Sequence, residues 1–96
     1  MSKGFEYGQL VATRGVYERM EAEPAFKDFC IKSFARHVFC DWGDVDEEDK
    51  RTNDESLEIG ERLMSAYIYN KDKDDKIWII TERDRSATTI LFPEEY

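Results

Sequence analysis

The sequence predicts an α+β fold, in which N-terminal helices pack on a C-terminal antiparallel β-meander of three to four strands. Apolar residues recur at helical spacing between positions 25 and 40, whereas they alternate with a period of two after Arg62. Short polar connections separate the later segments, which is typical of antiparallel neighbours. Helices first and strands afterwards place the helices on one face of the sheet.

Length and composition indicate one domain over residues 1–96. Apolar residues make up 41% of the chain, which is too large a share for simple disorder. The longest clearly apolar run, Ile77 to Ile80, is too short to span a bilayer, and the N-terminus lacks the apolar stretch of a signal peptide. We therefore expect a soluble, cytoplasmic protein with reduced cysteines.

The first half of the chain predicts a weak strand over residues 7–13, followed by two helices. Thr13 is a suitable N-cap for a helix over Arg14–Ala22, and Pro24 suits the first turn of the next helix. In the segment Ala25–Cys40, one helix face collects most of the apolar residues, namely Phe26, Phe29, Cys30, Ser33, Phe34, His37 and Cys40. We expect its three phenylalanines, Phe34 included, to anchor the core.

The second half predicts one solvated helix, or two short helical turns, and then three strands. Asp46 is a plausible N-cap and Gly60 a plausible stop for this helix. Alternation over residues 64–69, an apolar run over 76–82 and a third run over 88–92 give the strands. The middle run is apolar on both faces, which predicts a central strand.

The segment Asp41–Glu58, called the acid block below, is the most unusual stretch. It holds nine acidic and two basic residues, a net charge of −7, whereas the whole chain carries −8. A carboxylate-studded helix can imitate the charge spacing of a nucleic-acid backbone and occupy a basic groove; a solvated helix face is the simpler interpretation. The candidate partner-binding residues are Asp41, Trp42, Asp44, Asp46, Glu47, Glu48, Asp49, Asp54, Glu55 and Glu58.

The charge balance also limits the classes of partner. Direct binding to nucleic acid requires Lys and Arg to neutralise phosphates, and anionic membranes attract basic segments. We therefore expect no direct nucleic-acid binding and no membrane binding. A protein partner with a basic surface is the class that this composition favours.

Three constellations raise the alternative of a metal site or an enzyme. His37 lies between Cys30 and Cys40, but this spacing matches no common zinc pattern and lacks a fourth ligand. Asp44, Asp46, Glu48 and Glu55 match EF-hand ligand positions, but Asp49 stands where the loop requires glycine. Glu82 and Asp84 surround a turn without a recognised catalytic motif. We expect no metal or cofactor, and a buried His37 hydrogen-bonded to Asp41 or Asp44.

A resemblance adds a biological setting. The residues that carry it are R-H-V-F-C-D-W-G-D at 36–44, E-E-D-K at 47–50, N-D-E at 53–55, R-L-M-S-A-Y at 62–67 and I-W-I-I-T-E-R-D-R-S-A-T-T-I-L-F-P-E-E-Y at 77–96. Over roughly residues 9–96 the chain resembles a family of small uncharacterised proteins of bacterial plasmids, phages and integrative elements. The resemblance implies a mobile-element setting, in which small acidic proteins often serve as anti-CRISPR or anti-restriction inhibitors.

The sequence thus favours a non-enzymatic interaction protein that binds a basic surface of a host defence complex, such as a CRISPR effector or restriction complex. One alternative is a small metal-dependent or acid/base enzyme that uses His37 with Asp41, Asp44, Glu82 and Asp84. Another is an accessory or regulatory protein of plasmid maintenance. A pocket that combines His37 with carboxylates would favour the enzyme, and a convex acidic face would favour the interaction protein.

Overall fold

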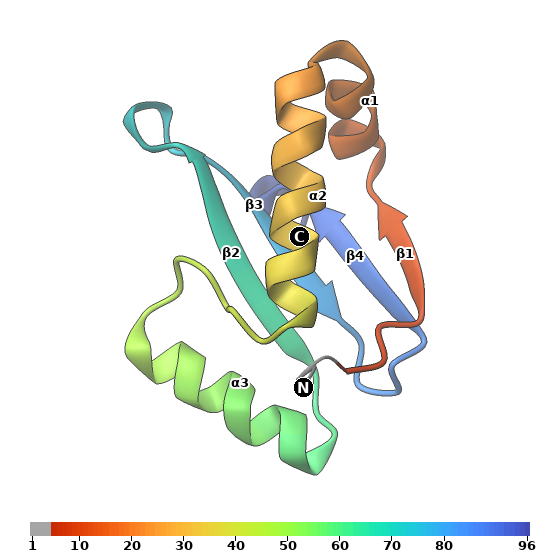
Figure 1. Cartoon of the computed structure of the whole chain (residues 1–96), viewed down its shortest axis with the longest axis vertical. Helices are drawn as coiled ribbons and strands as arrows, with labels where there is room; N and C mark the ends of the chain where they lie inside the picture. Colours follow the sequence, from red (N-terminus) through yellow and green to blue (C-terminus); the bar gives the residue numbers. More distant parts are fainter. Residues whose placement is uncertain (1–4) are drawn as a thin grey trace.

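The computed structural model describes residues 5–96 and shows an α+β fold with three helices in the N-terminal half and an open four-stranded sheet (Figure 1). In chain order the elements are β1 (Gln9–Ala12), α1 (Arg14–Ala22), α2 (Pro24–Val38), α3 (Glu47–Ile59), β2 (Leu63–Asn70), β3 (Asp75–Thr81) and β4 (Ala87–Leu91), with short 3-10 turns at Lys71–Lys73 and Pro93–Glu95. The predicted helices and strands are all present, and α3 is one helix rather than two short turns.

The sheet has the strand order β1-β4-β3-β2. Strands β2, β3 and β4 form the predicted antiparallel meander, and β3 lies inside the sheet as its apolar composition indicates. Strand β1 differs from the prediction, because it runs parallel to β4 and makes the sheet mixed. The sequence pattern does not reveal this pairing, because the partners are nearly 80 residues apart along the chain.

Local signals explain where the helices begin and end. The Thr13 hydroxyl accepts from the Val16 N–H at the start of α1, and the Asp46 carboxylate accepts from the Asp49 N–H at the start of α3. Pro24 occupies the first turn of α2. Gly60 ends α3 in the left-handed conformation with φ of 77°, which costs glycine little.

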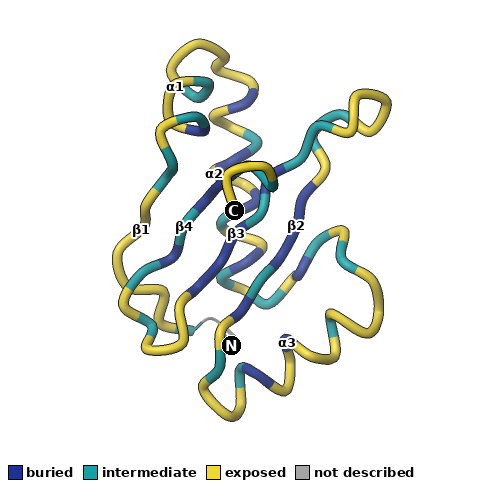
Figure 2. Tube along the Cα trace, turned by 180° about the vertical axis from the view of Figure 1, so that it is seen from behind, coloured by how far each residue is buried: buried dark blue, intermediate teal, exposed yellow. Residues whose placement is uncertain are grey.

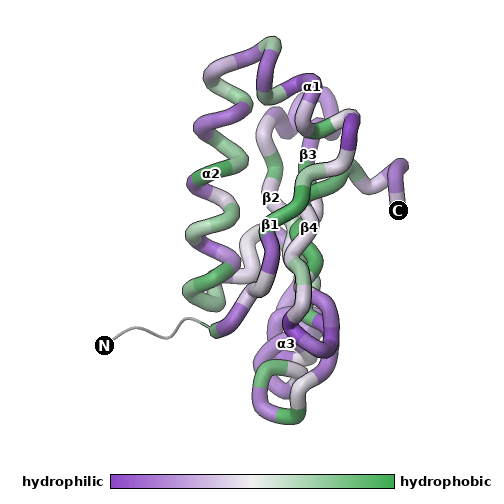
Figure 3. The backbone as a smooth tube through the Cα atoms, turned by 90° about the vertical axis from the view of Figure 1, so that its right-hand side faces the viewer, coloured by the Kyte–Doolittle hydropathy of each residue, from purple (hydrophilic) through white to green (hydrophobic). Residues whose placement is uncertain are grey.

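The core lies between helix α2, which covers one face of the sheet, and the strands, and helix α1 packs against α2 at the end of the sheet (Figure 3). On α2 the fully buried residues are Phe26, Cys30, Ser33 and His37, as the helical spacing predicts. Phe29 and Phe34 are half-buried and pack against this core, so of the three predicted anchors Phe26 alone is fully buried. Tyr7, which precedes β1, packs edge-on against the Phe34 ring.

Arg19 connects α1 to the start of strand β3. Its guanidinium donates two hydrogen bonds to the Asp75 carboxylate, at 2.8 and 2.6 Å, and lies 4.2 Å from the centroid of the Phe26 ring. The paired guanidinium holds the pKa of Asp75 below its usual value.

None of the helices within residues 5–96 has both the length and the apolar character that a bilayer crossing requires.

Candidate interaction surface

All nine acidic side chains of the acid block are exposed. Helix α3 lies beyond the β2 edge of the sheet, and most of its residues are exposed (Figure 2) and hydrophilic (Figure 3). The buried residues of this helix are the neutral Asn53 and Ser56. The structure therefore presents the carboxylates of the acid block at the surface and the neutral side chains of α3 to the sheet edge.

Asn53 mounts α3 on the sheet edge. Its amide nitrogen donates to the Met64 carbonyl at 2.7 Å, and its amide oxygen accepts from the Met64 N–H at 3.2 Å. The side chain therefore satisfies the same backbone groups that another strand would pair with. Sequence reasoning missed this residue, because an asparagine within a polar helix gives no signal that it points inward.

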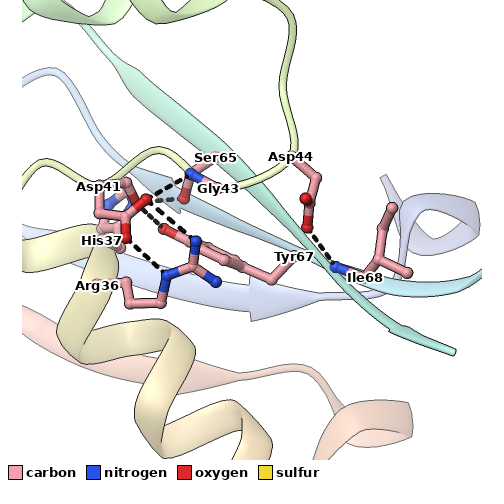
Figure 4. Close-up of polar contacts among 8 residues, drawn as sticks. All are labelled: Arg36, His37, Asp41, Gly43, Asp44, Ser65, Tyr67 and Ile68. Carbon is pink, nitrogen blue, oxygen red and sulfur yellow. Dashed lines mark hydrogen bonds and ion pairs between the residues drawn. The ribbon is translucent and has the colours of Figure 1, made fainter. Parts of the chain in front are cut away.

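The segment that precedes α3 pairs with the same edge. The Ala66 N–H donates to the Trp42 carbonyl at 3.4 Å, and the Asp44 N–H donates to the Ala66 carbonyl at 2.7 Å. The Asp44 carboxylate then accepts from the Ile68 N–H at 2.9 Å (Figure 4). Gly43 is required between them, because a Cβ there would lie 2.1 Å from the Ala66 carbonyl oxygen.

Trp42 is therefore not the exposed anchor that the sequence analysis expected. Only 3% of its surface is exposed, and its indole N–H donates to the Asp54 carboxylate at 2.9 Å. Asp41 accepts from Arg36 at 2.8 Å and from the Gly43 N–H at 3.2 Å (Figure 4), and the bond from Arg36 lowers the pKa of Asp41. These groups shape the connection between α2 and α3.

The ten candidate residues thus separate into two sets. The first set makes intramolecular contacts that stabilise the fold, and it comprises Asp41, Trp42, Asp44, Asp46 and Asp54. The second set, called the outer acids, consists of exposed side chains along α3 and comprises Glu47, Glu48, Asp49, Glu55 and Glu58. Among the outer acids Glu47 pairs with Lys50 at 3.3 Å, an exposed contact that costs little to give up, so this set is the better placed to meet a partner.

His37 is fully buried, but its hydrogen-bond partners differ from the expected Asp41 and Asp44. Nδ1 lies 2.6 Å from the Ser65 hydroxyl, and Nε2 lies 2.8 Å from the Thr81 hydroxyl. Burial is the main reason that its pKa falls to about 4. The expectation failed because both aspartates lie at the surface, while serine and threonine can satisfy a buried imidazole without a charge.

A chain of hydroxyl groups determines which nitrogen of His37 carries the proton. Thr88 donates to the Tyr7 carbonyl at 2.7 Å, so its oxygen accepts from the Thr81 hydroxyl 2.7 Å away. The Thr81 oxygen then accepts from Nε2–H of His37, and Nδ1 accepts from the Ser65 hydroxyl. The network is complete with a neutral histidine, and it joins α2, three strands and the N-terminal segment.

The residues proposed for an enzyme do not converge. His37 is buried among hydroxyl groups, whereas Glu82 and Asp84 are exposed at the turn between β3 and β4. A hollow of about 490 Å³ at this turn is lined by Gly60, Glu82, Arg83, Asp84 and Ser86. His37 is not among the residues that line it. Asp84 accepts from the Ser86 N–H at 3.0 Å, a contact that stabilises the turn.

The sequence also raised two possible metal sites, one at His37 with the cysteines and one among the carboxylates of the acid block. Within residues 5–96 no three of the His, Cys, Asp and Glu side chains are arranged to hold a metal ion. Cys30 is buried in the core, and burial raises the pKa of its thiol to about 11. The four carboxylates that match EF-hand positions lie on the edge segment and on α3 instead of in one loop.

Phe39 is a surface residue that sequence reasoning missed. Its side chain is 56% exposed, just after α2, and it lines a hollow of about 520 Å³ together with Cys40, Asp54, Leu57 and Glu58. A phenylalanine that follows an apolar helix ordinarily predicts core, so the sequence gives no sign of its exposure. The hollow places an aromatic ring beside two carboxylates.

Comparison of the chain with protein-family models, with curated protein sequences and with solved structures finds no match.

Proposed function

We propose that this chain is a small non-enzymatic interaction protein of a mobile genetic element. It acts in the cytoplasm of the host and inhibits a defence complex, a CRISPR effector or a restriction complex, by occupying a basic surface that otherwise holds nucleic acid. The observation that carries the proposal is the exposure of the outer acids on a helix that projects from the sheet edge.

The mounting of α3 supports this proposal. Asn53 attaches the helix to β2, and the Trp42–Asp54 contact attaches it to the segment that precedes it. The outer acids are therefore offered to a partner on a rigid support, and ordering the helix adds no cost at the moment of binding. A basic groove would be attracted over about 10 Å at moderate ionic strength.

The hollow beside Phe39 supplies the complementary apolar contact. A lysine or arginine of the partner could lay its aliphatic stem on Phe39 and Leu57 and direct its charge towards Glu58. Aromatic contacts of this kind often contribute most of the affinity at an interface, whereas exposed charges mainly accelerate association.

Neutralising the outer acids tests the mechanism. The variant Glu47→Gln, Glu48→Gln, Asp49→Asn and Glu55→Gln removes four charges that have no part in the edge contacts. A pull-down from a host that carries defence systems, analysed by mass spectrometry, identifies the partner with the wild-type chain. Association of that partner with the variant should be slower by about ten-fold or more, and added salt should slow the wild type towards the same rate.

A matched control removes the same charge elsewhere. Glu21, Asp72, Asp74 and Glu94 are exposed acids outside the acid block, and their amide variants together give the same net charge. Association that is equally slow for both quadruple variants would attribute the effect to net charge alone. An unchanged rate for the α3 variant with an intact fold would refute the nucleic-acid mimic.

A further inference from the structure

The two edges of the sheet differ in whether their outward backbone groups are hydrogen-bonded. At the β2 edge, the outward backbone groups of Met64 and Ala66 are paired with Asn53 and with the Trp42–Asp44 segment, and the Ile68 N–H is paired with Asp44. Exposed edges pair readily with other strands, and covering them is a common protection. The β2 edge is therefore closed to a further strand over this stretch.

The β1 edge presents its backbone outward. Gln9 donates its N–H to the Ser86 carbonyl, and Thr13 donates to the Ile90 carbonyl, so alternate residues face β4. The N–H and C=O groups of Leu10 and Ala12 consequently point away from the sheet. Figure 1 shows β1 as the outermost strand, with no other described element beyond it.

The side chains of this edge also lack the usual protection. Leu10 is 47% and Val11 38% exposed, and Tyr7 beside them is exposed as well. Residues 7–13 contain no charged residue, no proline and no bulge, in a chain of which 38% is charged. A charged, proline-containing or bulged strand would discourage pairing, and β1, although short, has none of these features.

The N-terminal segment is already held in the geometry that pairing needs. The Thr88 hydroxyl donates to the Tyr7 carbonyl at 2.7 Å. Gly8, with φ of 67°, lies so close to the turn before β4 that a Cβ would approach the Arg85 carbonyl oxygen to 2.4 Å. A second strand would therefore meet a preformed edge.

We propose that two copies of this chain pair through their β1 strands, antiparallel and about a two-fold axis at Val11. In this register Leu10 of one copy lies opposite Ala12 of the other, and their outward N–H and C=O groups form four hydrogen bonds. The two Val11 side chains face one another, at a Cα separation of about 4.5 Å. The two four-stranded sheets become one continuous sheet.

The charge distribution selects a second copy as the occupant of this edge. Helix α3 lies at the β2 edge, the opposite end of the strand order, so the two acid blocks are at the far ends of the dimer. In this register Arg14 of one copy lies opposite Gly8 of the other, and residues 7–13 are uncharged, so no like charges face one another along the paired strands. An isologous contact of this kind needs no surface beyond the one described.

Sedimentation velocity from about 1 µM to about 500 µM tests the pairing through mass action. The wild-type mass should rise from 11.4 kDa towards twice that value. Val11→Lys places two positive charges opposite one another and should weaken the dimer by about ten-fold or more. Ile31→Lys changes an even more exposed apolar residue on α2, and it should leave the dimer intact.

Cysteine cross-linking tests the register without relying on the lysine variant. In a Cys40→Ser background, Val11→Cys should form a disulfide-linked dimer on mild oxidation, since identical residues meet at the axis. Leu10→Cys should form much less, because Leu10 faces Ala12. A wild-type monomer throughout the concentration range, a dimer that survives Val11→Lys, or equal cross-linking at both positions would overturn the proposal.

Discussion

His37 is neutral in the folded protein because it is buried and its pKa falls from 6.5 to about 4. The unfolded chain binds the proton more readily, so the contribution of His37 to stability is complete above about pH 6.5 and is lost as the pH falls towards 4. The loss should reach up to about 3 kcal/mol. Denaturant unfolding at several pH values should show a steeper decline for the wild type than for His37→Gln, and parallel curves would contradict this prediction.

The two phenylalanines Phe26 and Phe34 test the packing of α2. Phe26 is fully buried and contacts Phe29, Tyr69, Phe92 and Arg19, so Phe26→Ala should cost about 3–5 kcal/mol. Phe34 is half-buried and should cost clearly less. Urea unfolding of both variants measures the difference, and equal losses would show that the core extends further towards Tyr7 than the structure indicates.

At the scale of elements, Asn53 determines where α3 sits. Asn53→Ala leaves the backbone N–H and C=O of Met64 without their partner, which should cost about 2–3 kcal/mol. Glu55→Ala alters an exposed neighbour on the same helix and should change stability by less than about 0.5 kcal/mol. Hydrogen exchange should show faster exchange of the Met64 amide in Asn53→Ala alone, and protection equal to the wild type would remove Asn53 from this role.

The elements themselves were predictable where their signals are local. Thr13, Pro24, Asp46 and Gly60 act within one helical turn, and the helices begin and end where these residues indicated. The parallel pairing of β1, the burial of Trp42 and the inward direction of Asn53 depend on contacts with distant parts of the chain. The exposure of the acidic side chains of α3 was therefore predictable, but which residues of the acid block are structural was not.

At the scale of the whole molecule, most of the net charge of −8 is gathered at one end. Repulsion among the carboxylates opposes folding, and salt screens it. Raising the salt concentration from about 20 mM to about 500 mM should increase the melting temperature by about 3 °C. The α3 quadruple variant should respond less than the control quadruple variant of equal charge. An equal response would show that the distribution of charge has no effect on stability.

The closure of the β2 edge by Asn53, the Trp42–Asp44 segment and the Asp44 carboxylate limits the growth of any assembly. A sheet with two open edges can recruit strands at both ends and lengthen into a fibril. This molecule has one such end, and symmetric pairing consumes it in both copies. Growth through the sheet therefore stops at the dimer. The covered β2 edge prevents the exposed β1 strand from leading to further aggregation.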